Sequence, residues 1–89
     1  MDFEWDPAKA AANFAKHGIR FEDAVLALED EFALTMRDAF VDEEERWITL
    51  GMDAQGVLLI VIYTWRGENI RLISSRRANA REQIQYEGK

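Results

Sequence analysis

Arginines gather in the last third of this chain, where they could bind a phosphate or another anion. Guanidinium groups stay charged and present a planar fork of donors that matches phosphate oxygens. Nearby aromatic rings could stack on the bases of a single-stranded nucleic acid. Five arginines and three aromatics fall between residues 63 and 86: Arg66, Arg71, Arg76, Arg77 and Arg81, with Tyr63, Trp65 and Tyr86. The set favours anion binding, although any one of these arginines could instead pair with a neighbouring carboxylate.

Charge is distributed unevenly along the chain. Residues 1–60 carry 5 Lys/Arg against 14 Asp/Glu, a balance of −9, and residues 61–89 carry 6 against 3, a balance of +3. The net charge of −6 argues against a general polyanion binder. The asymmetry instead predicts that one face meets an anion. The acidic runs at residues 29–31 and 42–45 are interpreted as solvated turns or as a docking surface for a basic partner.

Two pairs of residues could move protons. Glu82 and Tyr86 are four positions apart on a predicted helix, so their side chains share one face beside the arginines. The alternative is that Tyr86 packs on the sheet and Glu82 pairs with an arginine. Lys16 and His17 form the second pair, because imidazole titrates near neutral pH. A basic pair before Gly18 is also what the end of a helix favours.

Several kinds of site are excluded by composition. The chain has no cysteine, which excludes disulfides, thiolate metal sites and a cysteine nucleophile. The single histidine, His17, excludes a multi-histidine metal site within one chain. A carboxylate site for magnesium is formally open, but nothing fixes its geometry, so we predict no metal and no cofactor.

Targeting and membrane segments are also not expected. The first residues lack the basic and apolar stretches of a signal peptide. The longest apolar run, residues 57–62, is too short to cross a bilayer. We therefore expect a cytoplasmic protein with no membrane contact.

Two helices are predicted in the first third of the chain. An Asp-Pro pair begins a helix over residues 7–17 and Gly18 ends it. Ala10 and Phe14 lie on its apolar face. A second helix follows to about residue 29, and its apolar stripe is expected in the core: Phe21, Ala24, Val25 and Leu28.

The rest of the chain reads mainly as strands with turn residues between them. A short edge strand is plausible at residues 3–5. Four further strands are expected at residues 32–37, 46–52, 57–65 and 70–75, and a closing helix at residues 79–87. The third of these four strands is apolar on both faces, which predicts a central position in the sheet.

The predicted class is α+β, in one domain of residues 1–89. It has two N-terminal helices, an antiparallel β-meander of about four strands and a C-terminal helix, with the helices on one side of a curved sheet. Paired strands bring their ends together, so Arg66 and Arg71 should flank one end of the last hairpin. Arg76 and Arg77 should emerge at its other end, so the five arginines cannot share one point.

Taken together, these residues resemble the BrnT family, the toxin half of a bacterial type II toxin–antitoxin pair. No single piece is decisive, but the order and spacing of the pieces are specific, and they span nearly the whole chain. The matching pieces are Phe3-Glu4-Trp5-Asp6-Pro7 with Lys9 and Asn13, Lys16-His17-Gly18 with Phe21-Glu22-Asp23-Ala24, Glu45-Arg46-Trp47 with Gly51, and Tyr63-Thr64 with Arg66-Gly67-Glu68, Ile70-Arg71-Leu72-Ile73-Ser74-Ser75-Arg76, Glu82 and Tyr86-Glu87.

The resemblance implies a RelE-like fold and a metal-independent endoribonuclease that acts on RNA. It also implies a BrnA-type ribbon-helix-helix antitoxin that covers the toxin and dimerises, so that operator DNA is reached only through the antitoxin. For catalysis it points to Arg66, Arg76 and Glu82. Further substrate-binding residues would be Arg71, Arg77, Tyr86, Lys16 and His17.

In such a reaction the 2′-hydroxyl of the substrate attacks the adjacent phosphorus. Arg66 and Arg76 would stabilise the developing charge. Glu82 or His17 would act as base, and Tyr86 or an arginine would assist the leaving oxygen. The alternative function is a non-enzymatic module that acts only as a co-repressor with its antitoxin. Sequence-specific DNA binding by this chain alone is disfavoured, because no helix is basic along one face.

Two positions depart from the family pattern. Arg20 stands where the family commonly has Ser or Thr, so the second helix loses a side-chain cap worth about 1 kcal/mol. Ser75 stands where the family favours Ala. Both residues are expected to leave the function unchanged.

Overall fold

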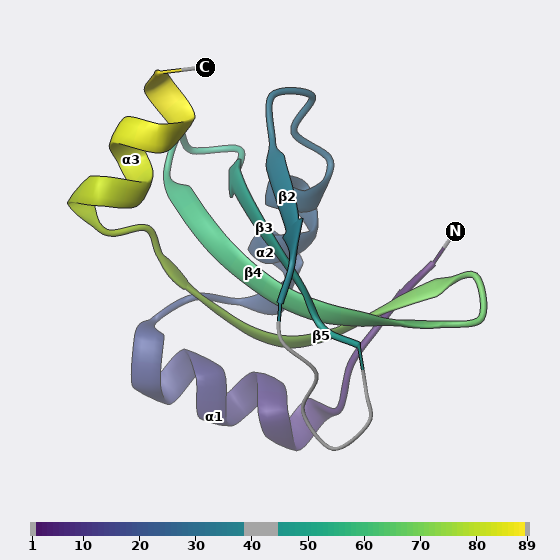
Figure 1. Cartoon of the computed structure of the whole chain (residues 1–89). Coiled ribbons are helices and arrows are strands. Elements are labelled where there is room, and N and C mark those ends of the chain that lie inside the picture. Colours follow the sequence, from purple (N-terminus) through teal and green to yellow (C-terminus); the bar gives the residue numbers. More distant parts are fainter. Residues whose placement is uncertain (1, 39–44, 89) are drawn as a thin grey trace.

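The computed structural model describes residues 2–38 and 45–88 (Figure 1). The helices within them are α1 (Pro7–His17), α2 (Phe21–Leu28) and α3 (Ala80–Glu87), and the strands are β1 (Phe3–Glu4), β2 (Leu34–Arg37), β3 (Trp47–Met52), β4 (Leu58–Arg66) and β5 (Asn69–Arg77). This confirms the α+β class and the order of its elements. Of the acidic run predicted as a turn, residues 42–44 lie outside the described residues.

The described strands form one mixed sheet in the order β1-β5-β4-β3-β2. Strands β2 to β5 make the predicted antiparallel meander, and β4 lies at its centre as predicted. The sheet has a fifth strand because β1 pairs in parallel with β5, with Phe3 opposite Ile70 and Glu4 opposite Arg71. The start of the chain therefore lies against the strand that carries three of the five arginines between residues 63 and 86.

The face of the sheet under α1 and α2 holds the main core. Phe21 and Ala24 of α2 are fully buried against Leu59 and Val61 of β4. The stripe predicted for α2 is thus confirmed, with Val25 and Leu28 partly buried at its margin. At Gly51 of β3 an added Cβ would overlap the carbonyl oxygen of Ala27, so the close approach of α2 to the sheet requires glycine there.

The opposite face of the sheet is covered by α3. Ala78 and Tyr86 pack there with Leu50 and Ile60, whereas Val61 points to the other face. The prediction that the helices lie on one side was therefore wrong for α3. Ala78, which joins β5 to α3, is buried on this second face and carries the helix across to it.

Helix α1 contacts the sheet through Ala10, which packs on the main core as predicted, and through a buried amide. The predicted face residue Phe14 is 47% exposed, with the Arg20 guanidinium carbon 5.4 Å from its ring centroid. Asn13 instead points inward, and its side chain accepts from Ser75 N at 3.0 Å and donates to Ser75 O at 2.9 Å. Strand β1 pairs with β5 only at residues 70–71. The Asn13 amide therefore satisfies the β5 backbone beyond the end of β1.

The ends of the first two helices agree with the sequence. Asp6 accepts from Ala8 N at 2.8 Å, and Gly18 ends α1 with a φ of 71°. Arg20 makes no side-chain cap at the start of α2, as predicted. In the described part of the chain, no helix is long and apolar enough to cross a membrane.

Candidate active site

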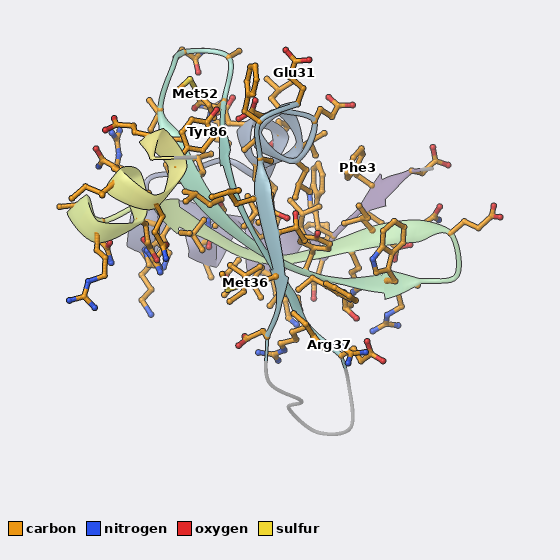
Figure 2. All side chains as sticks on the ribbon, turned by 45° about the horizontal axis from the view of Figure 1, so that its top comes forward. Phe3, Glu31, Met36, Arg37, Met52 and Tyr86 are labelled. Carbon is orange, nitrogen blue, oxygen red and sulfur yellow. The ribbon has the colours of Figure 1, made fainter. Side chains whose placement is uncertain are left out.

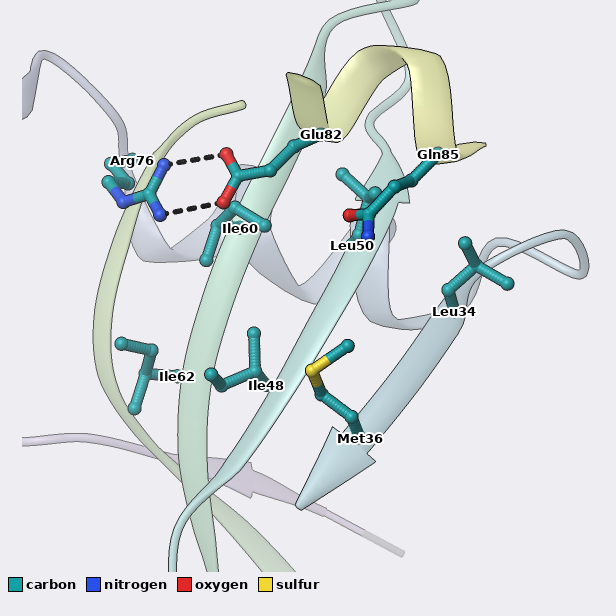
Figure 3. Close-up of a pocket in the computed structure, with 9 residues that line it drawn as sticks. All are labelled: Leu34, Met36, Ile48, Leu50, Ile60, Ile62, Arg76, Glu82 and Gln85. Atoms are coloured by element: carbon teal, nitrogen blue, oxygen red, sulfur yellow. Dashed lines mark hydrogen bonds and ion pairs between the residues drawn. The ribbon is translucent and has the colours of Figure 1, made fainter. Parts of the chain in front are cut away.

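Arg76 and Glu82 form a bidentate ion pair on the α3 face (Figure 3). Arg76 Nη1 and Nη2 donate to the two carboxylate oxygens of Glu82, each at 2.9 Å. Glu82 also accepts from the backbone of Asn79, whose side chain in turn accepts from Glu82 N, and both distances are 2.8 Å. This capping box places Glu82 in the first turn of α3. The start of the helix therefore fixes the orientation of an arginine on the sheet.

The pair shifts the pKa of both of its members. The hydrogen bond from Arg76 lowers the pKa of Glu82, and the backbone bond from Asn79 lowers it further against the opposing effect of burial. The hydrogen bond to Glu82 raises the pKa of Arg76. Both groups are therefore charged at neutral pH.

Arg76 keeps donors for a second anion. Nη1 donates to Glu82 and, at 3.2 Å, to the carbonyl oxygen of Arg77, while Nη2 donates once to Glu82. A guanidinium has five N–H donors. Among the described residues, Nε–H and one Nη2–H of Arg76 thus have no acceptor, so a phosphate oxygen could bind without displacing Glu82.

Tyr86 anchors the far end of α3. Its hydroxyl donates to Asp30 Oδ2 at 2.7 Å, and the same oxygen accepts from Met52 N at 2.9 Å. The hydrogen bond to Asp30, together with burial, raises the pKa of Tyr86 to about 12. Tyr86 thus packs on the sheet while Glu82 pairs with an arginine, which is the alternative that the sequence left open.

An apolar groove of about 520 Å³ lies beside the ion pair (Figure 3). Its floor is formed by aliphatic side chains from β2, β3 and β4, and its rim by polar side chains of β5 and α3. The floor consists of Leu34, Met36, Ile48, Leu50, Ile60 and Ile62, and the rim of Arg76, Glu82 and Gln85.

Arg66 lies far from Arg76, as the hairpin predicted. It stands opposite Asn69 at the β4–β5 turn, whereas Arg76 stands opposite Ile60. Six positions along β4 separate residue 66 from residue 60, which is roughly 20 Å at 3.3 Å per residue. One phosphate therefore cannot contact both arginines in this structure.

Arg71 and Arg77 lie at different positions on β5 and have different neighbours. Arg71 Nη1 donates to Glu4 Oε2 at 2.9 Å, which ties it to the edge strand β1. Its neighbours Ile70 and Leu72 face the main core, so Arg71 points to the α3 face. Arg77 is exposed and lines a shallow depression with Gly56 of the β3–β4 turn.

Lys16 and His17 end α1 beside β5. Together with Asn13 they line a shallow depression that includes Ile73 and Ser74. These strand residues belong to the half of β5 that carries Arg76. The pair also occupies the last turn of α1, as expected of basic residues at a helix end.

The aromatics of the segment do not form the stacking surface that the sequence suggested. Tyr63 is buried in the main core, where its hydroxyl lies 2.9 Å from the hydroxyl of Thr49. Trp65 is 45% exposed. Of the three aromatics, Trp65 is therefore the one most open to a base.

Sequence reasoning missed two residues that position the site. Asn13 holds the edge of β5 next to Arg76. The sequence pattern that could have indicated this role is a polar residue three positions after Ala10, on the inward side of α1. Asp30 holds α3 through Tyr86. No local sequence pattern indicated the role of Asp30, because its partner is 56 residues away.

Figure 2 shows Tyr86 near the top of the molecule and Met36 on β2.

The described residues contain no group of three or more histidine, cysteine or carboxylate side chains that could hold a metal ion. The candidate site therefore consists of the ion pair, the groove and the separated arginines.

The sequence and the fold of this chain are both similar to those of a known protein family. The sequence model of a family described as the ribonuclease toxin BrnT of type II toxin–antitoxin systems matches residues 5–82. The chain belongs to the BrnT family. Its fold is similar to the crystal structure of the Brucella abortus ribonuclease toxin BrnT, with a TM-score of 0.66 and 27% identity over 89% of this chain and 97% of that chain. No curated protein matches it.

Membership of the BrnT family makes this chain a ribonuclease toxin of a type II toxin–antitoxin system, with a protein antitoxin as its partner. The matched span includes Arg66, Arg71, Arg76 and Glu82, whereas Tyr86 lies beyond it. The Arg76–Glu82 pair therefore falls inside the family match.

Proposed function

We propose that this BrnT family member cleaves RNA without a metal ion. A substrate 2′-hydroxyl attacks the adjacent phosphorus, the bond from that phosphorus to the 5′-oxygen of the next nucleotide breaks, and an arginine assists this leaving oxygen as it takes up a proton. The observation that carries the proposal is the bidentate Arg76–Glu82 pair, which holds a charged arginine with unused donors at the surface. A fixed guanidinium supplies positive charge where the pentavalent phosphorus develops negative charge. The BrnT family match makes RNA the substrate class.

Arg76 is the central catalytic residue of the proposal. Its free Nε–H and Nη2–H would bind the scissile phosphate while Glu82 keeps the guanidinium in place. A preorganised donor of this kind contributes roughly 100- to 1000-fold to a rate, because it needs no reorganisation during the reaction. Arg76 therefore takes the charge-stabilising role for itself, since Arg66 is too far away to share it.

Glu82 first orients Arg76. Its lowered pKa makes it a weak base near neutral pH, because a proton can be accepted only at the expense of its hydrogen bonds to Arg76. Glu82 would accept the 2′-hydroxyl proton on Oε2, which accepts one hydrogen bond from Arg76 among the described residues, while Arg76 stays in place. His17 at the edge of β5 is the alternative base, because imidazole is the side chain best suited to carry a proton near neutral pH.

The remaining basic residues would hold other parts of the RNA. Arg71 and Arg66 lie on the same hairpin as Arg76, Arg77 ends β5, and Lys16 lies beside β5 at the end of α1. They would bind phosphates away from the scissile bond. Tyr86 keeps its proton near neutral pH and acts by holding α3 in place.

The partner would be a BrnA-type ribbon-helix-helix antitoxin that neutralises the toxin in the cytoplasm and carries it to operator DNA. Support comes from the BrnT family match. The net charge of −6 adds to it, because an acidic chain is a poor DNA binder by itself.

The test is cleavage of labelled RNA by the purified protein in excess EDTA. Wild type should cleave, and Arg76→Lys should be at least about 100-fold slower, because lysine cannot bind carboxylate and phosphate in fork geometry. Arg66→Lys is the matched control and should stay within about 10-fold of wild type.

Full activity of Arg76→Lys would refute the role of Arg76. Restoration of cleavage only by added divalent ions would refute metal independence. No cleavage under any condition, together with tight antitoxin binding, would identify the chain as a non-enzymatic co-repressor.

A further inference from the structure

Helix α3 leaves much of its sheet face bare. Its eight residues span about 12 Å, whereas the nine residues of β4 span about 30 Å. Leu50 and Ile60 are buried beside α3, while Ile48 and Ile62 further along are only half-buried and Met36 is 56% exposed. Figure 1 shows α3 at one end of the sheet. An apolar sheet face is normally buried against another layer of secondary structure, and this part of the face lacks such a layer.

The chemistry of the groove favours an aliphatic occupant. None of the residues that line it is aromatic, and its two charged side chains, Arg76 and Glu82, are paired with one another. Nucleic-acid bases bind protein through aromatic or guanidinium stacking and hydrogen bonds. A floor of Leu, Ile and Met side chains instead suits the apolar face of a helix.

Charge identifies the kind of helix. The described residues in and beside β2, residues 29–38 and 45, contain five Asp or Glu and one arginine. A partner that lies along β2 thus meets carboxylates near both ends of that strand. Complementary charge would come from lysines and arginines on the polar face of that helix.

We propose that this groove binds an amphipathic, basic helix of the protein antitoxin. Its aliphatic residues would pack on Met36, Ile48 and Ile62, and its basic residues would face the described carboxylates near the ends of β2, such as Glu31 and Asp38. A helix in this position lies against the Arg76–Glu82 pair. Inhibition by covering that pair rests on the proposed ribonuclease function, whereas docking itself does not.

The experiment uses the full chain and the antitoxin encoded beside it, with affinity measured by titration calorimetry. Met36→Glu places a charge on the exposed floor and should weaken binding at least about 30-fold, because an unpaired charge would be buried. Leu26→Glu, at a 40% exposed site on α2 across the sheet, is the matched control and should stay within about 3-fold. Met36→Leu should also bind like wild type.

Unchanged affinity of Met36→Glu, or equal weakening by Leu26→Glu, would overturn the proposal. A wild-type dimer that Met36→Glu abolishes would assign the groove to a second copy of the chain. Loss of RNA binding with antitoxin binding intact would assign it to RNA. Lost antitoxin affinity in a toxin that never cleaves RNA would support docking and refute only the ribonuclease proposal.

Discussion

The two faces of the sheet are held by different interactions. On the α1–α2 face, fully buried apolar side chains such as Phe21 and Val61 surround neutral hydrogen bonds. On the other face, α3 contributes no buried residue. Helix α3 is fixed instead by the Arg76–Glu82 ion pair at its start and by the bond from Tyr86 to Asp30 at its end.

The two faces therefore contribute differently to the stability of the fold and to the chemistry of the candidate site. Burial of apolar area supplies most of the folding free energy and is insensitive to pH. Ion pairs and charged hydrogen bonds respond to pH and salt, and they orient the groups that could act on a phosphate. The α1–α2 face therefore stabilises the molecule, while the α3 face carries the candidate site.

Phe21→Ala should have the largest effect on stability. We expect a loss of about 3–5 kcal/mol in the free energy of unfolding, from lost burial and the cavity left in the main core. Ile84→Ala on α3, where Ile84 is 68% exposed, should cost less than about 0.5 kcal/mol. Urea denaturation measures both, and similar losses would contradict the separation of the two faces.

Tyr86→Phe tests the anchor of α3. Loss of a hydrogen bond to a charged acceptor should cost about 1.5–3 kcal/mol at pH 7. The pKa of Tyr86 is raised from 10 to about 12, so this stability is fully present below pH 10 and is lost as the pH rises toward 12. The difference between wild type and variant should shrink over that range in thermal melts. A pH-independent difference would mean that Asp30 does not hold the hydroxyl.

Glu82→Gln removes the charge of the ion pair and keeps a side chain that can complete the capping box. We expect a loss of about 1 kcal/mol at neutral pH, because the pair is partly exposed and screened by solvent. The pKa of Glu82 is lowered in the folded state, so the contribution is present above its ordinary value and disappears as the pH falls through the lowered one. Denaturation at pH 7 and pH 3 should show a smaller difference between wild type and variant at pH 3.

Ser75→Ala should have the smallest effect and the opposite sign. The Ser75 hydroxyl oxygen is buried and has no hydrogen-bond partner in the described structure. Removal of a buried, unsatisfied hydroxyl should stabilise the α1–α2 face by about 0.5 kcal/mol. A destabilised variant would show that the hydroxyl has a partner, such as a buried water molecule.

Local chemistry made most of the elements predictable. An Asp-Pro start and Gly18 bounded α1, and the turn at residues 66–69 set the β4–β5 hairpin. The hairpin alone was enough to place Arg66 and Arg76 at opposite ends. For the candidate site, the sequence allowed Glu82 to pair with an arginine but left open which one.

Long-range contacts made the remainder unpredictable. The bond from Tyr86 to Asp30 spans 56 residues, and the bonds from Asn13 to Ser75 span 62. No periodicity in the sequence reports such a pairing, because periodicity reflects only which residues share a face of one element. Phe14 was misassigned for the same reason, since a buried amide took the inward position.

The sequence by itself determined the helices, the meander, the central place of β4 and the division of the arginines, because these depend on neighbours within a few positions. The tertiary structure decided that α3 crosses to the second face, that Arg76 is the arginine held by Glu82, and that an apolar groove opens beside them. Which face a closing helix covers depends on where the whole sheet still exposes apolar surface. That surface exists only after the strands have paired.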